Sequence, residues 1–269
     1  TTMLISDPSD LANSNIYGFF SLEGAAHASG WISEIPPEWQ KTLGGEFITG
    51  WASNFAIDSR NSNGLSAFVV DLNNLEPSTN VESIIPTTAL MDFPLKHPLH
   101  EDKYNNNNTE RRDNFNDDTL PTVVGNNDLW TVLSWAVYGF IIPNTSTYAV
   151  FGSSGGHESG IGYKVRQTTG KLCGGPCAND ANDYYNYYWL FDVDDLVAVK
   201  NGDKLPYEIR PYEYGKFPAP FQTEPNIKQH KYEHFRAIRG GDYHADSSTL
   251  YLVLGGPGWE ELVVIAYSI

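Results

Sequence analysis

A glycine-rich segment, residues 152–166, carries the side chains that acid–base chemistry needs. His157, Tyr163 and Arg166 lie within ten positions of one another, among small residues that let a ligand approach the backbone closely. In β-elimination on a uronate polysaccharide, a base removes a proton, a phenol acts as the acid and a cation neutralises the carboxylate. These three residues are therefore candidate catalytic residues. The alternative is a glycine-rich hairpin with solvated charges, in which a backbone carbonyl satisfies the histidine.

The same segment contains a second candidate cation and a pattern typical of serine hydrolases. If residues 161–166 form one strand, Lys164 and Arg166 share a face, which makes Lys164 a candidate ligand-binding residue. Residues 152–156 also match the Gly-x-Ser-x-Gly pattern of serine hydrolases. That pattern needs a helix directly after the serine, and no helical period follows here. We therefore interpret the match as accidental.

A run of aspartates indicates either a cation site or capped turns. Asp180, Asp183 and Asp194 are candidate Ca²⁺ ligands, since calcium accepts loosely arranged carboxylate oxygens. Their spacing does not match the EF-hand loop. Asp71 and Asp192 are better explained as turn caps, which bond their own backbone two residues on.

Aromatic side chains crowd the segment 184–189. Tyr184 and Tyr187 are candidate ligand-binding residues, because exposed rings stack on the C–H face of a sugar. We add His244, in the sequence Gly-Gly-Asp-Tyr-His, to this set. The alternative is that these rings pack in the core, since aromatic residues dominate that setting too.

The two cysteines, Cys173 and Cys177, flank Gly-Gly-Pro. We predict that they form a small disulfide ring, which indicates an oxidising compartment. A zinc site would need two more ligands nearby, and the closest histidine is His157.

Charge and hydropathy exclude several classes of protein. Of the 269 residues, 17 are Lys or Arg and 33 are Asp or Glu, so the formal net charge is −16. This balance argues against binding to nucleic acid and against docking on an anionic membrane. The sequence has no run of 18 apolar residues, so we expect no membrane insertion.

Short strand-like runs between Gly, Pro, Asn and Ser predict an all-β fold. Residues 37–43, which begin with Pro and precede Gly44-Gly45, predict one or two helical turns. The polar segment 101–127 predicts a surface insert. The predicted strands are 45–50, 66–71, 135–142, 147–152, 187–191, 249–254 and 262–267.

An internal repeat organises these strands. Residues 68–75 align with residues 189–196, by the rule aromatic, two apolar residues, Asp, apolar, two Asx, Leu. A weaker copy, Asp-x-x-Asp-Leu, starts at Asp7. The predicted strands that precede the two aligned segments also recur, and residues 240–267 give a third version of those strands. Repeated meanders of this kind build β-propellers, whereas a sandwich does not predict a long-period repeat.

Three segments carry a resemblance to a known family: Gly30–Gln40 with Leu43-Gly44-Gly45, residues 189–212, and Gly240-Gly241-Asp242-Tyr243 followed by Leu-Tyr-Leu. The chain resembles uncharacterised secreted bacterial proteins with β-propeller-type repeats, over most of residues 5–269. The resemblance implies that this chain corresponds to the C-terminal half of such a propeller. It implies no reaction and no functional residue.

We therefore expect one all-β domain over residues 1–269, built of four-stranded antiparallel blades. It would be a partial propeller or a small ring of four to five blades. The expected function is a secreted, extracellular module that binds a glycan or a protein, or serves a structural role. The alternative is a lyase of anionic polysaccharides using the His/Tyr pair. A second chain or an oligomer is expected to complete the propeller, because an open arc exposes strand edges.

Overall fold

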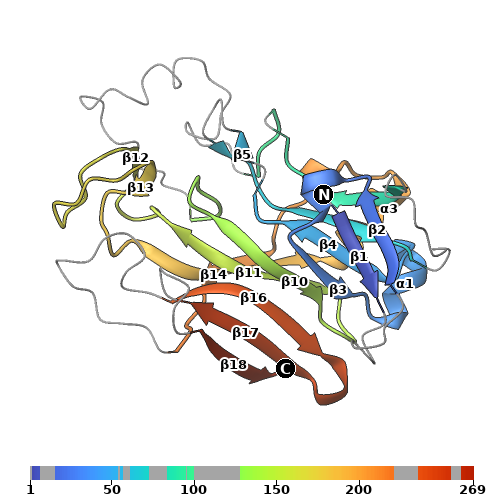
Figure 1. The fold of residues 1–269 in the computed structure, drawn as a ribbon. Helices are drawn as coiled ribbons and strands as arrows, with labels where there is room; N and C mark the ends of the chain where they lie inside the picture. The colour runs from blue at the N-terminus through green and yellow to red at the C-terminus, as the bar shows by residue number, and fades with distance from the viewer. Residues whose placement is uncertain are drawn as a thin grey trace.

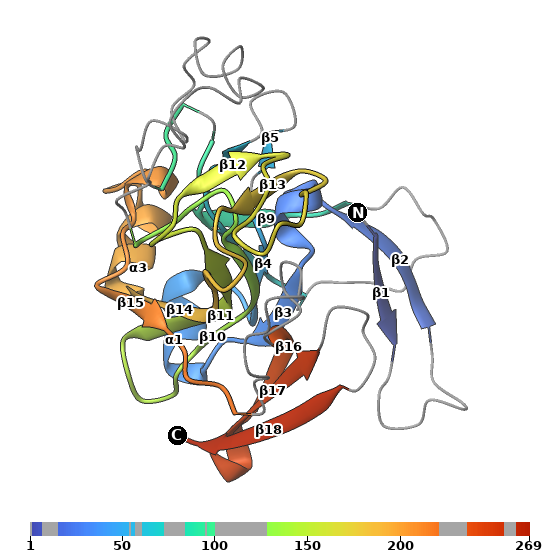
Figure 2. The same ribbon diagram turned by 90° about the vertical axis from the view of Figure 1, so that its left-hand side faces the viewer.

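The computed structural model describes residues 2–6, 16–53, 55–56, 61–72, 84–94, 96–99, 128–220, 236–255 and 262–269. Strands predominate, as predicted (Figures 1 and 2). The polar insert expected at 101–127 and the Asp-x-x-Asp-Leu copy at Asp7 lie outside the described residues.

The first four-stranded sheet is an antiparallel meander whose strands follow one another in chain order. Helix α1, Pro37–Leu43, connects its first two strands and matches the predicted helical turns. The helix ends at Gly44, which adopts a left-handed φ of 83° and donates its N–H to the carbonyl of Gln40. The strands are β3 (Trp31–Glu34), β4 (Phe47–Trp51), β7 (Ser66–Val70) and β9 (Thr87–Met91).

The second four-stranded sheet repeats this arrangement. Its strands are β10 (Trp135–Ile141), β11 (Thr147–Gly155), β14 (Tyr184–Asp192) and β15 (Glu213–Lys216). Residues 68–70 and 189–192 of the sequence repeat lie in β7 and at the end of β14, and each of these is the third strand of its sheet. Their predicted equivalence is therefore confirmed.

A helix that was not predicted follows β14. Asp192 caps it by accepting a hydrogen bond from the Asp194 N–H at 3.0 Å, as the turn-cap interpretation requires. The chain then continues as α3, Val193–Asn201, up to the left-handed Gly202. Helix α3 packs against β9, so it joins the second sheet to the first.

Two three-stranded sheets and two short strand pairs complete the described fold. One sheet contains β16 (Ala237–His244), β17 (Thr249–Gly255) and β18 (Val263–Ser268). The other contains β1 (Thr2–Ser6), β2 (Ile16–Leu22) and β8 (Ile84–Ile85), with β2 and β8 parallel. The pairs are β5 (Phe55–Ala56) with β6 (Asn61–Ser62), and β12 (Ile161–Tyr163) with β13 (Pro176–Ala178). Short 3₁₀ turns are η1 (Ala25–Ala28), η2 (Pro206–Glu208) and η3 (Ala245–Ser247).

The sheets pack in the order in which they occur along the chain. Phe20 and Leu22 of β2 pack with Phe68 and Val70 of the first sheet. One large core then joins the first, second and third meanders. The first strands of these meanders lie together, with β10 in contact with both β3 and β16 (Figure 1). None of the described sheets closes into a barrel.

Candidate functional site

A cleft opens where β3, β10 and β16 meet. Its volume is about 540 Å³. Its lining combines aromatic rings with carboxylates and one histidine. The lining includes Glu34, Tyr138, Phe140, Asp242, Tyr243 and His244.

Three strands contribute these residues to the lining. Asp242 and His244 stand two residues apart on β16 and point to one side of the strand, whereas Tyr243 between them points to the other. Tyr243 stacks on Phe140 of β10, with ring centroids 4.8 Å apart. Glu34 is the last residue of β3, where the side chain is exposed.

The first strands of the second and third meanders, β10 and β16, each contain a shift in register. The register of β10 against β11 shifts between Ala136 and Tyr138, and that of β16 against β17 shifts between Ile238 and Gly240. Each shift places one extra residue near the start of the strand, which bends it and re-aims the following side chains. The bulges are thus a further repeated feature, and both precede residues that line the cleft.

Hydrogen bonds and burial fix the floor of the cleft. The Ser33 hydroxyl donates to the carbonyl of Gly139 at 2.7 Å, which ties β3 to β10. Tyr138 is almost fully buried, and burial raises the pKa of its phenol to about 12. A hydrogen bond with Ser33 opposes this rise, and the nearby charge of Asp242 adds to it. The phenol therefore stays protonated near neutral pH.

The lining favours neutral or positively charged ligands. Carboxylates of Glu34, Asp242 and Asp246 accept hydrogen bonds from hydroxyl or ammonium groups. The half-buried ring of Tyr243, which stacks on the buried Phe140, offers a flat apolar surface. In the described part of the chain, no lysine or arginine lines this cleft.

His157, the candidate base, lies outside this cleft, at the end of β11. Its Nε2 is 2.7 Å from the Ser154 hydroxyl, and its ring stacks on Tyr187 and Tyr185 at 5.2 and 6.0 Å. Ser154 is buried, and its hydroxyl is also 2.8 Å from that of Ser134. Ser154 lies on a strand that no helix follows directly, so the serine-hydrolase match is accidental.

Asp183 organises the network beside His157. One of its carboxylate oxygens accepts bonds from the backbone N–H groups of Glu158 and Ser159 and from the Ser159 hydroxyl. The other accepts the hydroxyl of Tyr185. Burial, followed by this bond, raises the pKa of Tyr185. Lys216 lies 3.7 Å from the Tyr185 ring centroid and 2.6 Å from a Glu158 oxygen.

The other two candidate catalytic residues lie farther along the chain. Strand β12 ends at Tyr163 and Lys164 has a left-handed φ of 54°, so residues 161–166 do not form one strand. The Arg166 guanidinium donates to the carbonyl of Gly170 within its own turn, at 2.7 Å. The side chain of Tyr163 lies outside the described residues.

The candidate sugar-stacking tyrosines are buried. Tyr184 accepts the Ala178 N–H through its hydroxyl, and Tyr187 donates to the carbonyl of Asp128. These contacts fit the alternative of core packing. His244, in contrast, lines the cleft, and its Nδ1 is 3.0 Å from the Ser247 hydroxyl.

The candidate calcium ligands lie in separate arrangements. Asp183 accepts the protein donors described above, and Asp180 accepts the Asn182 N–H and the Thr168 hydroxyl. Asp194 stands in the first turn of α3. Among the residues that the structure describes, no three His, Cys, Asp or Glu side chains group as metal ligands.

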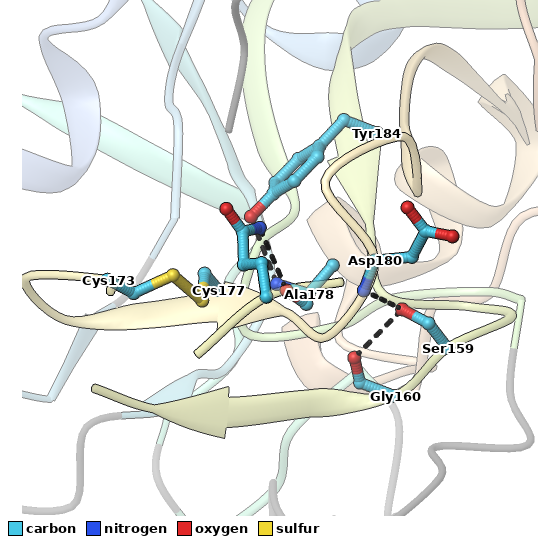
Figure 3. The surroundings of a disulfide bond; sticks show 8 residues. Ser159, Gly160, Cys173, Cys177, Ala178, Asp180 and Tyr184 are labelled. Carbon is cyan, nitrogen blue, oxygen red and sulfur yellow. Dashed lines mark hydrogen bonds between the residues drawn. A yellow bond between two sulfur atoms is a disulfide. The ribbon is translucent and has the colours of Figure 1, made fainter. Parts of the chain in front are cut away.

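The cysteines form the predicted pair. The sulfur atoms of Cys173 and Cys177 are 2.06 Å apart, so the disulfide is confirmed. Figure 3 shows it beside Ala178, below Tyr184. Both cysteines are buried.

Sequence analysis missed Glu34, Tyr138 and Asp242 as site residues. An alignment of the first strands of the repeats could have indicated them, because each of the three residues lies on or at the end of such a strand.

No helix among the described residues is long and apolar enough to cross a membrane. No protein-family model matches the chain, and no curated protein or solved structure proved similar to it.

Proposed function

We propose that this chain is a secreted, β-propeller-like module that binds glycans in the cleft between β3, β10 and β16. Three consecutive meanders, with their first strands side by side, support the propeller-like interpretation. In a propeller the blades are arranged around a central channel, and the cleft lies where the first strands of these meanders meet. The disulfide supports an oxidising, extracellular setting.

The lining of the cleft carries the glycan assignment. A sugar ring presents hydroxyls at its edge and C–H groups on its face. Carboxylates such as Asp242 accept bonds from the hydroxyls, and Tyr243 offers an aromatic surface to the C–H face. The carboxylates also favour neutral or amino sugars over uronates in this cleft.

Calorimetric titration with neutral and amino-sugar oligosaccharides tests this proposal. Asp242→Asn should weaken binding of a positive ligand about tenfold, because it removes a charge-assisted hydrogen bond. Asp203→Asn, which changes the same charge at an exposed site after α3, should have no effect. Equal losses in both variants, or no binding by the unmodified protein, would refute the cleft as the glycan site.

The lyase alternative receives less support from the geometry. His157 Nε2 lies 2.7 Å from the Ser154 hydroxyl, and the Arg166 guanidinium donates to the carbonyl of Gly170. Absorbance of unsaturated uronates, followed over a panel of anionic polysaccharides, would detect this activity. A rate that disappears in His157→Ala would favour the lyase over the binding module.

A further inference from the structure

We propose that two copies of this chain pair through β18, so that their third sheets join into one continuous sheet. The contact lies on the outer side of the third sheet, two strands away from β16, and does not depend on the cleft's ligand. We refer to the side of β18, Val263–Ser268, that faces away from β17 as the β18 edge.

Among the described residues, the third sheet has one strand fewer than each of the two four-stranded sheets. In those sheets the third strand pairs on its far side with a fourth, β9 or β15. In the third sheet β18 pairs with β17, and no other described strand pairs with it (Figure 1). The position that a fourth strand occupies in the other two sheets is therefore open to a strand from another molecule.

The ladder between β17 and β18 shows which backbone groups point toward the β18 edge. The Ile269 N–H donates to the carbonyl of Ser248, the residue opposite it, at 2.9 Å. Along an antiparallel ladder, opposite residues that bond in this way alternate with opposite residues that do not. Val264, Ala266 and Ser268 belong to the pairs that do not bond, so their N–H and C=O groups point away from β17.

The outer strands of the two four-stranded sheets have protection that β18 lacks. Helix α3 contacts β9, and β15 is only four residues long with a charge at each end, Glu213 and Lys216. Covering helices, short strands and charges of this kind keep edge strands from pairing with other chains. Strand β18 has six residues, no proline, no charge and no shift in its register with β17. The β18 edge therefore has the properties of a strand that pairs.

The β18 edge is complementary to itself. An antiparallel pair of β18 strands centred on Ala266 places Ala266 opposite its own copy and Val264 opposite Ser268. All of these residues direct their backbone groups outward, so donors of one copy meet acceptors of the other. The same pairing keeps the exposed side chains of Val264 and Ala266 on one face of the joined sheet.

The distribution of charge also favours a second copy over a charged partner. Strands β17 and β18 contain no Lys, Arg, Asp or Glu, although the chain carries a net charge of −16. Two copies can therefore meet here without like charges opposite each other. Repulsion between the rest of the two chains is screened beyond about 8 Å at physiological ionic strength. A charged peptide or polysaccharide would find no opposite charge on these two strands.

The test combines light scattering with hydrogen exchange resolved to single amides, both on the intact protein. The mass should be about twice the 29.9 kDa of one chain and should fall on dilution. The amides of Val264, Ala266 and Ser268 should exchange at least about tenfold more slowly in the dimer than in the diluted monomer. The Ile265 amide, which bonds to β17 in both states, serves as the internal reference.

Two substitutions at one position locate the contact. Ala266→Pro removes an outward N–H but no bond between β17 and β18, and proline is tolerated at such edge positions. We expect this variant to have the mass of one chain. Ala266→Val keeps the N–H and favours a strand, so it should keep the mass of two chains. Melting temperatures check that both variants fold, and if Ala266→Pro does not fold, the exchange rates of the unmodified protein decide.

Several results would overturn the proposal. They are a mass of one chain at every concentration, the same mass for Ala266→Pro as for the unmodified protein, or a dimer whose edge amides exchange as fast as in the monomer. Protection of these amides that is independent of concentration would place a segment of the same chain on the β18 edge. Asp242→Asn should leave the mass unchanged, so failure of the cleft proposal is distinguishable from failure of this one.

Discussion

At the scale of single residues, His157 shows how a reactive side chain can be held by its neighbours. A line of hydroxyls runs from Ser134 through Ser154 to the imidazole, and the Thr131 N–H donates to Ser134. Because Ser134 accepts this bond, its own proton is available to Ser154, which can in turn donate to His157. The line orients the ring on Tyr187 and Tyr185.

Removing the central hydroxyl should therefore cost stability. Ser154→Ala removes the acceptor of the buried Ser134 hydroxyl and the hydroxyl that contacts His157 Nε2, so we expect a loss of about 1–3 kcal/mol. Ser153→Ala, at the neighbouring and half-buried position on β11, should change stability by less than about 0.5 kcal/mol. Urea denaturation measures both, and equal effects would contradict the hydroxyl line.

A second residue-scale prediction concerns pH. The Nδ1 atom of His27 lies 3.2 Å from an Asp92 oxygen, and this hydrogen bond raises the pKa of His27 above 6.5. The folded state thus holds the proton more tightly than the unfolded chain. The contribution to stability is complete below about pH 6.5 and is lost as pH rises through the higher folded value.

Both side chains are partly exposed, so the effect should stay below about 1 kcal/mol. Melting temperatures recorded between pH 5.5 and 8.5 would show it as a small decline. His27→Gln should flatten this part of the profile. An unchanged decline in that variant would assign the effect to another group.

At the scale of elements, the third strand of each meander and the segment after it define the repeat. In the second meander this segment becomes α3, because Asp192 caps it and buried Val193, Leu196 and Val199 face the core. Helix α3 contacts β9 of the preceding sheet. A local cap therefore contributes to a contact between two sheets.

Asp192→Ala should weaken that contact. Loss of the N-cap bond to the Asp194 N–H costs about 1 kcal/mol. Asp203→Ala, beyond the far end of α3, is the matched control and should be nearly neutral. Chemical denaturation compares the two, and a neutral Asp192→Ala would show that packing alone holds the helix.

At the scale of the whole molecule, the sheets differ in how many of their faces are covered. The second sheet is buried on both faces between its neighbours, as the pattern of β11 shows. The third sheet buries Ile265 but exposes Val264, at 63%, and Tyr251. Val264 pairs with Val253, and Ala266 with Tyr251, so these apolar residues share one outward face.

We predict that a second chain or copy covers this face. Light scattering after gel filtration should give a mass above that of one chain, 29.9 kDa. Val264→Asp should shift the mass to one chain without lowering the melting temperature, because a charge on this face opposes association. Thr249→Asp, at the half-buried end of β17, serves as the control. A monomeric unmodified protein would refute the prediction.

Features that depend on neighbouring residues could be predicted from the amino-acid pattern alone. Turn residues and alternation located the strands, Pro37 and Gly44 bounded α1, and four positions separate the bonded Cys173 and Cys177. The repeat predicted the equivalence of β7 and β14, because the same local pattern recurs. These signals come from residues close together in the chain, so one sequence is enough to recognise them.

Which distant groups meet could not be predicted without the packed sheets. Glu34, Tyr138 and Asp242 come from three separate strands and face one cleft, because bulges and sheet packing set their register. Alternation could not say which tyrosines are exposed, since the second sheet is buried on both faces and Tyr184 and Tyr187 turn inward. Lys164 likewise adopts a left-handed backbone conformation, and β12 ends just before it, so residues 161–166 do not continue as one strand. Register, burial and strand ends depend on contacts between segments far apart in the chain, and these contacts exist only once the sheets have packed.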